Sequence, residues 1–164
     1  MKLILIACVS KNLALGYQNE LIYNLPDDMK HFRETTRGHT VIMGSNTYRS
    51  LPNGALPKRR NIVLSRKTDG LPGCDVYDSL GRALSICQEN EEVFIIGGAS
   101  IYAQAIELAD ELILTEVDDI PEKADTYFPE FSKDDWELTK RVGHLADDKH
   151  PHSFAFAYYK RRTK

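Results

Sequence analysis

The sequence has little cysteine, no long apolar run and no surplus of one charge. Its three cysteines are an odd number at long spacings, which argues against a disulfide framework or a zinc knuckle. No stretch approaches the roughly 20 apolar residues of a membrane helix. The formal net charge is −3, and the one basic run is short and terminal. We therefore expect no membrane partner and no nucleic-acid partner.

Catalytic motifs of the hydrolase and metalloenzyme classes are also missing. The five histidines lack metal-ligand spacing, and no glutamate completes an HExxH pattern. No serine lies in a GxSxG pattern. We expect no metal site, and we expect His150 and His152, which lie in a polar loop, to be exposed. The short apolar run of residues 3–9 is followed by no small-residue cleavage site, so it reads as a buried strand. Together with three reduced thiols, this predicts a cytoplasmic protein.

Strands and helices alternate along the 164 residues, which favours one α/β domain over residues 1–164 with a mainly parallel sheet. The last two strand patterns follow each other without a helix, which predicts an antiparallel pair at the end of the sheet. The expected strands cover residues 2–9, 40–43, 61–65, 93–98, 111–117, 136–142 and 153–159. The expected helices begin at Pro26, near Asn46, after Ser79 and after Gly98, and residues 10–25 and 66–73 are expected to be loops.

Two segments pass from a strand through glycine directly into a helix. They are VFIIGGASIY at residues 93–102 and VIMGSNTYRSL at residues 41–51. Glycine permits a close approach, and the free N–H groups of a helix start attract phosphate. Neither segment is a GxGxxG fingerprint, so each alone also fits a tight turn. Both turns are expected at the carboxyl edge of the sheet, where such folds bind ligands.

Two further segments carry charge at informative places. In NLPDDMKHF, residues 24–32, Asp28 lies beside an apolar stripe, so it can point into a pocket or simply complement the helix dipole. In NIVLSRK, residues 61–67, Arg66 and Lys67 follow a strand, where they suit a 2′-phosphate or are ordinary solvated charges.

Taken in order and spacing, these segments resemble the dihydrofolate reductase family nearly end to end. The resemblance rests above all on LP-x-D, IMG-x-x-T and IGG-x-x-x-Y. It implies an eight-stranded, mostly parallel sheet with an antiparallel C-terminal strand and about four flanking helices. It also implies a monomeric enzyme that transfers a hydride from NADPH to dihydrofolate, giving tetrahydrofolate for one-carbon and thymidylate metabolism.

The resemblance assigns roles residue by residue. Asp28 becomes the carboxylate that binds the pterin, and Thr115 holds it; we expect burial beside Met29 and Phe32 to raise the pKa of Asp28. Water admitted near Leu21 and Tyr23 becomes the proton donor. The implied catalytic set is Asp28, Tyr23, Leu21 and Thr115. The implied substrate-binding set is Ile6, Ala7, Asp28, Met29, Phe32, Leu51, Arg59 and Thr115, with Arg59 gripping the α-carboxylate of the glutamate tail.

The resemblance likewise implies where NADPH binds and which loop covers it. Residues 13–23 match the family's active-site lid, and the two glycines at 97–98 match a cis peptide. The implied cofactor-binding set is Ala7, Leu15, Gly16, Asn19, Gly44, Ser45, Asn46, Thr47, Leu64, Ser65, Arg66, Ile96, Gly97, Gly98, Ala99, Ser100, Ile101 and Tyr102.

Three positions depart from the family pattern. Tyr23 stands where tryptophan is usual, Ser45 where arginine is usual, and Lys58 where glycine is common. Ser45 removes a cationic contact to cofactor phosphate, for which Arg66 can compensate. Two alternatives stay open: another pterin or pyrimidine reductase of the same fold, and a nucleotide-binding module without chemistry. Neither needs Asp28, Thr115 and Arg59 together.

Overall fold

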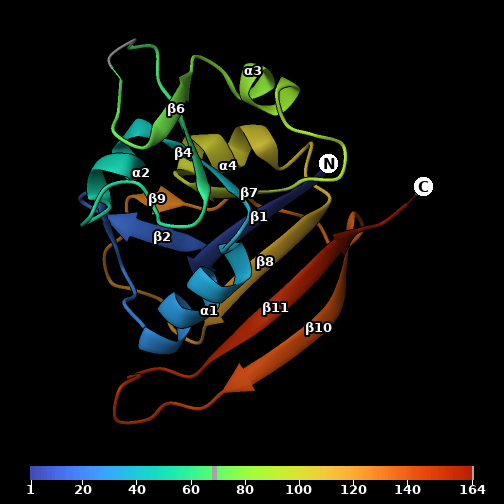
Figure 1. Cartoon of the computed structure of the whole chain (residues 1–164). Coiled ribbons are helices and arrows are strands. Elements are labelled where there is room, and N and C mark those ends of the chain that lie inside the picture. The colour runs from blue at the N-terminus through green and yellow to red at the C-terminus, as the bar shows by residue number, and fades with distance from the viewer. Residues whose placement is uncertain (68–69, 164) are drawn as a thin grey trace.

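The computed structural model describes residues 1–67 and 70–163. Its main feature is one eight-stranded sheet in the order β10-β11-β8-β1-β7-β4-β5-β6 (Figure 1). The pairs from β8 to β6 are parallel, whereas β11 is antiparallel to both β8 and β10. The α/β fold, the eight strands and the antiparallel C-terminal strand are confirmed.

The elements agree with the predicted segments to within one or two residues at most ends. In α1, proline occupies the first turn together with Asp27 and Asp28, as the helix dipole favours. The sheet comprises β1 (Lys2–Val9), β4 (Thr40–Gly44), β5 (Arg60–Leu64), β6 (Cys74–Tyr77), β7 (Glu92–Gly97), β8 (Glu111–Val117), β10 (Trp136–His144) and β11 (Phe154–Arg161). The helices are α1 (Pro26–Thr36), α2 (Ser45–Ser50), α3 (Leu80–Ser85) and α4 (Ala99–Ala105).

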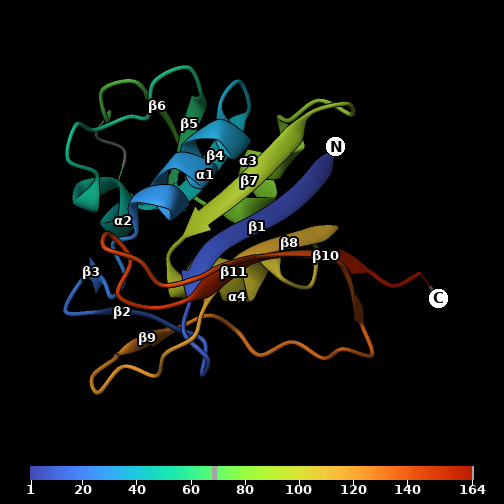
Figure 2. The ribbon, with the colours of Figure 1, turned by 90° about the horizontal axis from the view of Figure 1, so that it is seen from below.

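Alternating side chains of the central strands supply two hydrophobic layers. One layer unites Leu3, Leu5 and Ile42 with side chains of α3 and α4. The other unites Ile4 and Ile6 with Phe32 of α1, Tyr48 of α2 and Leu51, which directly follows α2. Helices therefore cover both faces of the sheet, and Figure 2 shows α1 and α4 on opposite sides of β1. This is why each central strand reads as a continuous apolar run.

Residues 10–25, expected to be a loop, contain two strands of a second sheet. It has the order β3-β2-β9, with β2 (Ala14–Tyr17), β3 (Glu20–Leu21) and β9 (Thr126–Tyr127). Gly16, in the segment expected to be a loop, lies inside β2. A Cβ at Gly16 would lie 2.7 Å from the Glu20 carbonyl oxygen, so this strand pair needs glycine there. Asn19 does lie in a turn, with φ 65°.

Three other features differ from or extend the predictions. Strand β6 was missed, and the loop predicted over residues 66–73 includes positions 68 and 69, which lie outside the described residues. His150, expected to be exposed, is 1 % exposed. No helix among the described residues is long and apolar enough to cross a membrane. In both Figure 1 and Figure 2 the loop between β10 and β11 runs beside the N-terminal end of α1.

Candidate active site

Asp28 forms the buried carboxylate of the site. The Thr115 hydroxyl on β8 donates a hydrogen bond of 2.5 Å to Asp28 Oδ1. Cys8 lies opposite Thr115 in the register of β1 and β8. Burial raises the pKa of Asp28, and this effect is partly offset by the Thr115 hydroxyl, by His31 and by Cys8. The direction is the expected one. Burial, reinforced by the same carboxylate, also raises the pKa of the Cys8 thiol.

The apolar surroundings of Asp28 are only partly those expected. Met29 is 55 % exposed, so the expectation that it buries the carboxylate was wrong. The helical turn directs Met29 away from the sheet, whereas Phe32 packs against the layer that contains Ile6. Leu51, at the C-terminal end of α2, packs against the same layer. Ile6, Phe32 and Leu51 therefore form one apolar surface near Asp28.

Tyr23 is buried and its hydroxyl has a partner outside the predicted set. The hydroxyl donates a 2.8 Å hydrogen bond to Asp119 Oδ2, and burial together with this bond raises the pKa of Tyr23. The ring packs in the cluster of Leu25, Val117 and Phe154. Leu21, at the end of β3, is 73 % exposed. The structure therefore brings the Tyr23 ring close to β8 but commits its hydroxyl to Asp119.

Arg59 is held near the C-terminal end of α1. Its Nη1 donates to Thr36 Oγ1 at 3.1 Å and its Nε donates to the Pro57 carbonyl at 2.9 Å. These two bonds leave other N–H groups of the planar guanidinium for a ligand. Burial, with the positive charges of Arg33 and Arg37, lowers the pKa of Arg59. An anion bound there would relieve this repulsion.

The residue before Arg59 adopts a backbone conformation that favours glycine. Lys58 has φ 58°, and its carbonyl accepts a 2.8 Å hydrogen bond from the Gly38 N–H. A non-glycine residue in this left-handed region costs roughly 1 kcal/mol. The departure at this position therefore costs some stability and leaves the loop that carries Arg59 in place.

The two glycine turns meet, because β4 and β7 are neighbouring parallel strands with Met43 opposite Gly97. A Cβ on Gly97, where φ is 133°, would lie 3.2 Å from Thr47 Oγ1. A Cβ on Gly98 would lie 3.5 Å from the same oxygen, and one on Gly44 3.4 Å from Ile101. The peptide between Gly97 and Gly98 is cis, as expected. Gly97 is therefore the position at which this turn requires glycine, whereas a Cβ at Gly44 or Gly98 would make an ordinary contact at the carboxyl edge of the sheet.

The helices that start at these turns leave their first N–H groups without a side-chain cap. Gly44 and Gly98 are the N-cap residues of α2 and α4, and neither offers a side chain. By contrast, Ser79 caps α3 by accepting from the Arg82 N–H. The start of α1, after Leu25, is likewise without a side-chain cap. Uncapped helix starts can bind anionic oxygens, and those of α2 and α4 lie at this edge of the sheet.

The remaining predicted cofactor residues fall into two groups. Those that continue the same edge of the sheet are Ala7 on β1, Ile96 on β7, Ala99, Ser100 and Ile101 in α4, Ser45, Asn46 and Thr47 in α2, and Leu64, Ser65 and Arg66 at the end of β5, which pairs with β4. Those in the small sheet or its turn are Leu15, Gly16 and Asn19. Leu15 is buried in the core and Asn19 is exposed, so these two do not share one surface.

Tyr102 joins α4 to β1 across the site. Its hydroxyl donates a 2.7 Å hydrogen bond to the Ile6 carbonyl, and burial raises its pKa strongly. A Cβ on Gly97 would lie 3.7 Å from this hydroxyl. Tyr102 therefore fixes the glycine turn relative to the strand that carries Ile6 and Ala7.

Reasoning from the sequence missed several residues of the site. Cys8 and His31 influence Asp28, Asp119 holds Tyr23, and Arg33 and Arg37 influence Arg59. The helical spacing of Asp28 and His31 was a usable signal, since residues three apart share a helix face. Asp119 carried no such signal, because its contact with Tyr23 joins segments 96 positions apart.

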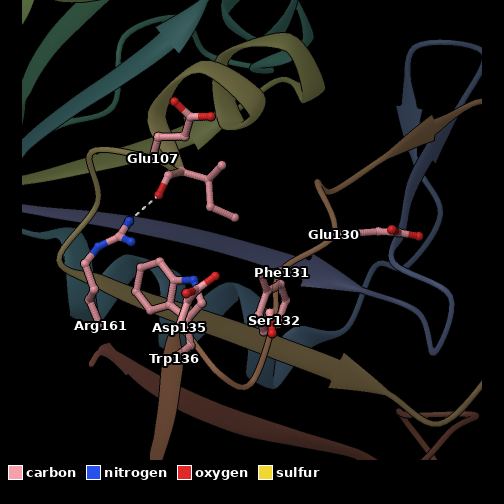
Figure 3. A pocket seen from close by; sticks show the side chains of 8 residues that line it. Glu107, Glu130, Phe131, Ser132, Asp135, Trp136 and Arg161 are labelled. Carbon is pink, nitrogen blue, oxygen red and sulfur yellow. Dashed lines mark hydrogen bonds between the residues drawn. The ribbon is translucent and has the colours of Figure 1, made fainter. Parts of the chain in front are cut away.

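A pocket of about 500 Å³ lies elsewhere, between the end of α4 and β10 (Figure 3). Arg161 crosses it, donating to the carbonyls of Ile106 and Ala109 at 2.6 and 2.8 Å. The guanidinium also lies 4.4 Å from the centre of the Trp136 ring. These contacts tie the last strand to the core. None of the pocket's lining residues belongs to the predicted site, and we assign it a structural role.

This arrangement defines an α/β protein with two strand–glycine–helix turns and a buried carboxylate at the same edge of the sheet. The pattern of the family described as "Dihydrofolate reductase" matches residues 2–161. The chain belongs to the dihydrofolate reductase family.

Individual relatives agree with this assignment. The chain is 40 % identical to the dihydrofolate reductase of Neisseria meningitidis serogroup A over 162 residues, covering 98 % of this chain and 99 % of that protein. It is 36 % identical to the Bacillus subtilis dihydrofolate reductase over 159 residues, covering 96 % and 94 %. The structure of the Enterococcus faecalis dihydrofolate reductase, complexed with NADP(H) and RAB-propyl, matches with a TM-score of 0.91 at 27 % identity and covers 99 % of this chain and 97 % of that one.

Proposed function

We propose that this chain is a dihydrofolate reductase that converts dihydrofolate to tetrahydrofolate with NADPH. The observation that carries the proposal is the hydrogen-bonded pair of Asp28 and Thr115 at the sheet edge that also carries the two glycine turns. One part can bind a nitrogen heterocycle, and the other can bind a dinucleotide. The Enterococcus relative, complexed with NADP(H), supports the choice of cofactor.

The residues at the glycine turns fit NADPH. Glycine at position 97 leaves space where a side chain would crowd Thr47, and its φ of 133° disfavours any side chain there. The uncapped starts of α2 and α4 offer N–H groups to phosphate oxygens, and Arg66 offers a positive charge beyond β5. When bound, NADPH supplies the hydride; the chain supplies position and electrostatics.

We assign Asp28 the orienting role in substrate binding. Its carboxylate accepts hydrogen bonds from the amino group and ring nitrogen of the pterin, and such charge-assisted bonds are strong where water is scarce. Thr115 positions this carboxylate through its hydroxyl. The apolar surface of Ile6, Phe32 and Leu51 packs against the ring system. Asp28 thereby polarises the pterin toward protonation.

The proton itself comes from water admitted beside Leu21, in our proposal. Leu21 is exposed at the end of β3, in the segment that would act as the lid. The Tyr23 hydroxyl donates to Asp119, so we give Tyr23 the role of anchoring the lid to the segment that follows β8, and not of touching the substrate.

Arg59 is proposed to bind the α-carboxylate of the substrate's glutamate tail. Arg33 and Arg37 add positive charge around it, and its guanidinium keeps N–H groups beyond those used by Thr36 and Pro57. A carboxylate held by two N–H groups of an arginine is a strong, oriented contact.

We further propose that the enzyme acts in the cytoplasm as a monomer. Cys8, Cys74 and Cys87 are free thiols, which suits a reducing compartment. The glycine turns and the carboxylate both come from one chain, so the reaction asks for no second subunit.

The test is the loss of nicotinamide absorbance when purified protein meets NADPH and dihydrofolate. We expect rapid oxidation with dihydrofolate and much slower oxidation with a dihydropterin that lacks the glutamate tail. An Arg59→Met variant is expected to lose that preference while keeping its activity on the tail-less substrate. If a folded protein binds NADPH but does not oxidise it with either substrate, the assignment fails in favour of another reductase of this fold or a binding module.

A further inference from the structure

A cluster of Asp27, His144 and His150 lies on the outer side of α1, away from the Asp28–Thr115 pair. Asp27 belongs to the first turn of α1, His144 ends β10, and His150 lies in the loop that leads to β11. One ligand atom from each side chain lies within 4.8 Å of the others. We call this group the Asp27 cluster. It joins two segments more than 110 residues apart, which Figure 1 shows side by side.

The contact between His144 and Asp27 requires a positive charge. His144 Nδ1 lies 2.7 Å from the Leu145 carbonyl oxygen, which can only accept, so Nδ1 carries a hydrogen. In neutral His144 the other nitrogen, Nε2, then bears a lone pair. Yet Nε2 lies 2.9 Å from Asp27 Oδ2. Two lone pairs at that distance repel, so either a proton or a cation lies between them.

Hydrogen bonds also fix which nitrogen of His150 bears the hydrogen and which bears the lone pair. Its Nδ1 lies 2.8 Å from Asp147 Oδ1, and its side chain is only 2 % exposed. Its Nε2 accepts the backbone N–H of Asp27 at 3.2 Å, so Nε2 bears the lone pair and Nδ1 the hydrogen. Nε2 lies 4.0 Å from Asp27 Oδ1. Two imidazole nitrogens thus lie near one half-exposed carboxylate: His144 Nε2, and His150 Nε2, whose lone pair accepts the Asp27 N–H.

We propose that the Asp27 cluster binds a divalent transition-metal ion of the zinc class through Asp27, His144 Nε2 and His150 Nε2. Ligand atoms around tetrahedral zinc lie about 3.4 Å apart. Here Asp27 Oδ2 and His144 Nε2 are 2.9 Å apart, Asp27 Oδ1 and His150 Nε2 are 4.0 Å apart, and one ligand atom from each residue lies within 4.8 Å of the others, so shifts of about an ångström bring them around one ion. Two imidazoles and one carboxylate suit zinc and its neighbours and not calcium or magnesium. Asp27 is half exposed, so water can fill the fourth position.

The surroundings of both histidines are those of metal-binding histidines. A histidine that binds zinc usually donates its other N–H to a carboxylate or a backbone carbonyl, which fixes its orientation and raises its basicity. His150 has the Asp147 carboxylate and His144 has the Leu145 carbonyl. Metal binding replaces the hydrogen bond from the Asp27 N–H to His150 Nε2. The metal ion then links the start of α1 to the β10–β11 loop. This site departs from the expectation, made from the sequence, that no metal binds.

The experiment measures Zn²⁺ affinity of the untagged, chelator-treated protein at neutral pH, by competition with a zinc-binding dye. We expect one Zn²⁺ per chain with a Kd in the micromolar range or tighter. We also expect Co²⁺ to give the intense visible bands of four-coordinate geometry, and excess Zn²⁺ to raise Tm by about 5 °C or more. Affinity should fall in acid, because protons compete with the metal ion for its ligands.

Three variants separate this site from ordinary surface binding. Asp147→Asn removes the carboxylate that holds His150, and we expect Zn²⁺ affinity to fall roughly 10- to 100-fold. His144→Phe keeps the stacking on Phe154 but removes a ligand, so we expect a larger loss of affinity. Asp148→Asn, in the same loop, is the matched control and leaves affinity unchanged. If His144→Phe does not fold, Asp27→Asn takes its place.

The proposal is overturned if the parent and the ligand variants bind Zn²⁺ equally, or if the parent binds it no more tightly than about millimolar. Either result would mean that a proton fills the position between His144 and Asp27, so that the contact is an ion pair of protonated His144. Because these readouts do not involve enzyme turnover, their failure leaves the proposed reductase function untouched.

Discussion

Two adjacent carboxylates in the first turn of α1 have opposite environments. Asp28 faces the sheet, where burial raises its pKa and the Thr115 hydroxyl donates to it at 2.5 Å. Asp27 faces the β10–β11 loop, where its side chain is 49 % exposed and contacts His144 at 2.9 Å. Successive helical residues point about 100° apart, so one step along the chain separates the two sides.

This difference shows that residue type and helix position do not assign a carboxylate its role. Both aspartates complement the helix dipole equally well. The strand behind Asp28 supplies a hydroxyl and a dry surface, which suit the recognition of a heterocycle. The end of β10 and the following loop, beside Asp27, supply imidazoles, which suit a cation. The neighbouring elements, brought in from distant parts of the chain, make the distinction.

The strongest test of this comparison removes the charge of Asp28, the carboxylate on the inner side of α1 that faces the sheet. Asp28→Asn keeps the size of the side chain and can still accept from Thr115, but it removes the charge that orients the pterin. We expect kcat/KM for dihydrofolate to fall roughly 10²-fold, the scale of a lost charge-assisted contact at a reacting ring. Steady-state NADPH oxidation measures it.

Glu34→Gln is the matched control, because it removes an exposed carboxylate from the same helix. We expect it to change kcat/KM less than twofold. Equal losses in the two variants would mean that the net charge of α1, and not the position of Asp28, supports activity. The contrast between the two sides of the helix would then have no catalytic meaning.

The sequence predicted the elements that carry Asp28 but not its neighbours. Continuous apolar runs and strand-to-helix glycines identified β1, β4, β7 and β8, because buried parallel strands have that composition. The start of α1 followed from proline and two aspartates. The small sheet was missed because β2, β3 and β9 have two to four residues each, too few for a periodic pattern.

Side-chain environment was the part that sequence could not supply. Met29 looked like a buried neighbour of Asp28 and is exposed, whereas His150 looked exposed and is buried. Both outcomes depend on how α1 docks on the sheet and on where the β10–β11 loop returns. Those contacts join residues more than 80 positions apart, and no local pattern encodes them.

A second test weakens the inner side without removing its charge. Thr115→Val has nearly the same shape but cannot donate to Asp28. Because that donated bond lowers the pKa of Asp28, the variant should raise this pKa further, and kcat/KM should fall about 10-fold. Infrared difference spectra of the carboxyl group against pH follow the pKa. Thr115→Ser retains the hydroxyl and should behave like the parent; a loss in both variants would contradict the role of the hydrogen bond.

A third test asks what the inner carboxylate does to stability. Because its folded-state pKa is raised, Asp28 favours the folded state relative to unfolded only where it is protonated, and this contribution is lost as pH rises through that pKa. Asp28→Asn should therefore raise Tm at pH 7, on the order of 2 °C, with no difference below about pH 3.9. Thermal unfolding at both pH values measures this. A lower Tm at pH 7 would show that the charged form is stabilised in the fold.

The smallest effect is expected from His31, the second ionisable group on the inner side of α1. Its ring stacks on Phe156 at 4.0 Å and contacts the Tyr158 hydroxyl at 2.9 Å. Burial lowers the pKa of His31, so the side chain is mostly neutral at pH 7 and its positive charge favours the Asp28 carboxylate only in acid.

His31→Gln should therefore change kcat/KM at pH 7 by less than about threefold. In acid, where His31 is protonated in the parent, the substitution should raise the pKa of Asp28, because the positive charge that favours the carboxylate is gone. The same infrared titration, run on parent and variant, decides the matter. An identical Asp28 titration in both would mean that burial, Thr115 and Cys8 set the pKa of Asp28 without His31.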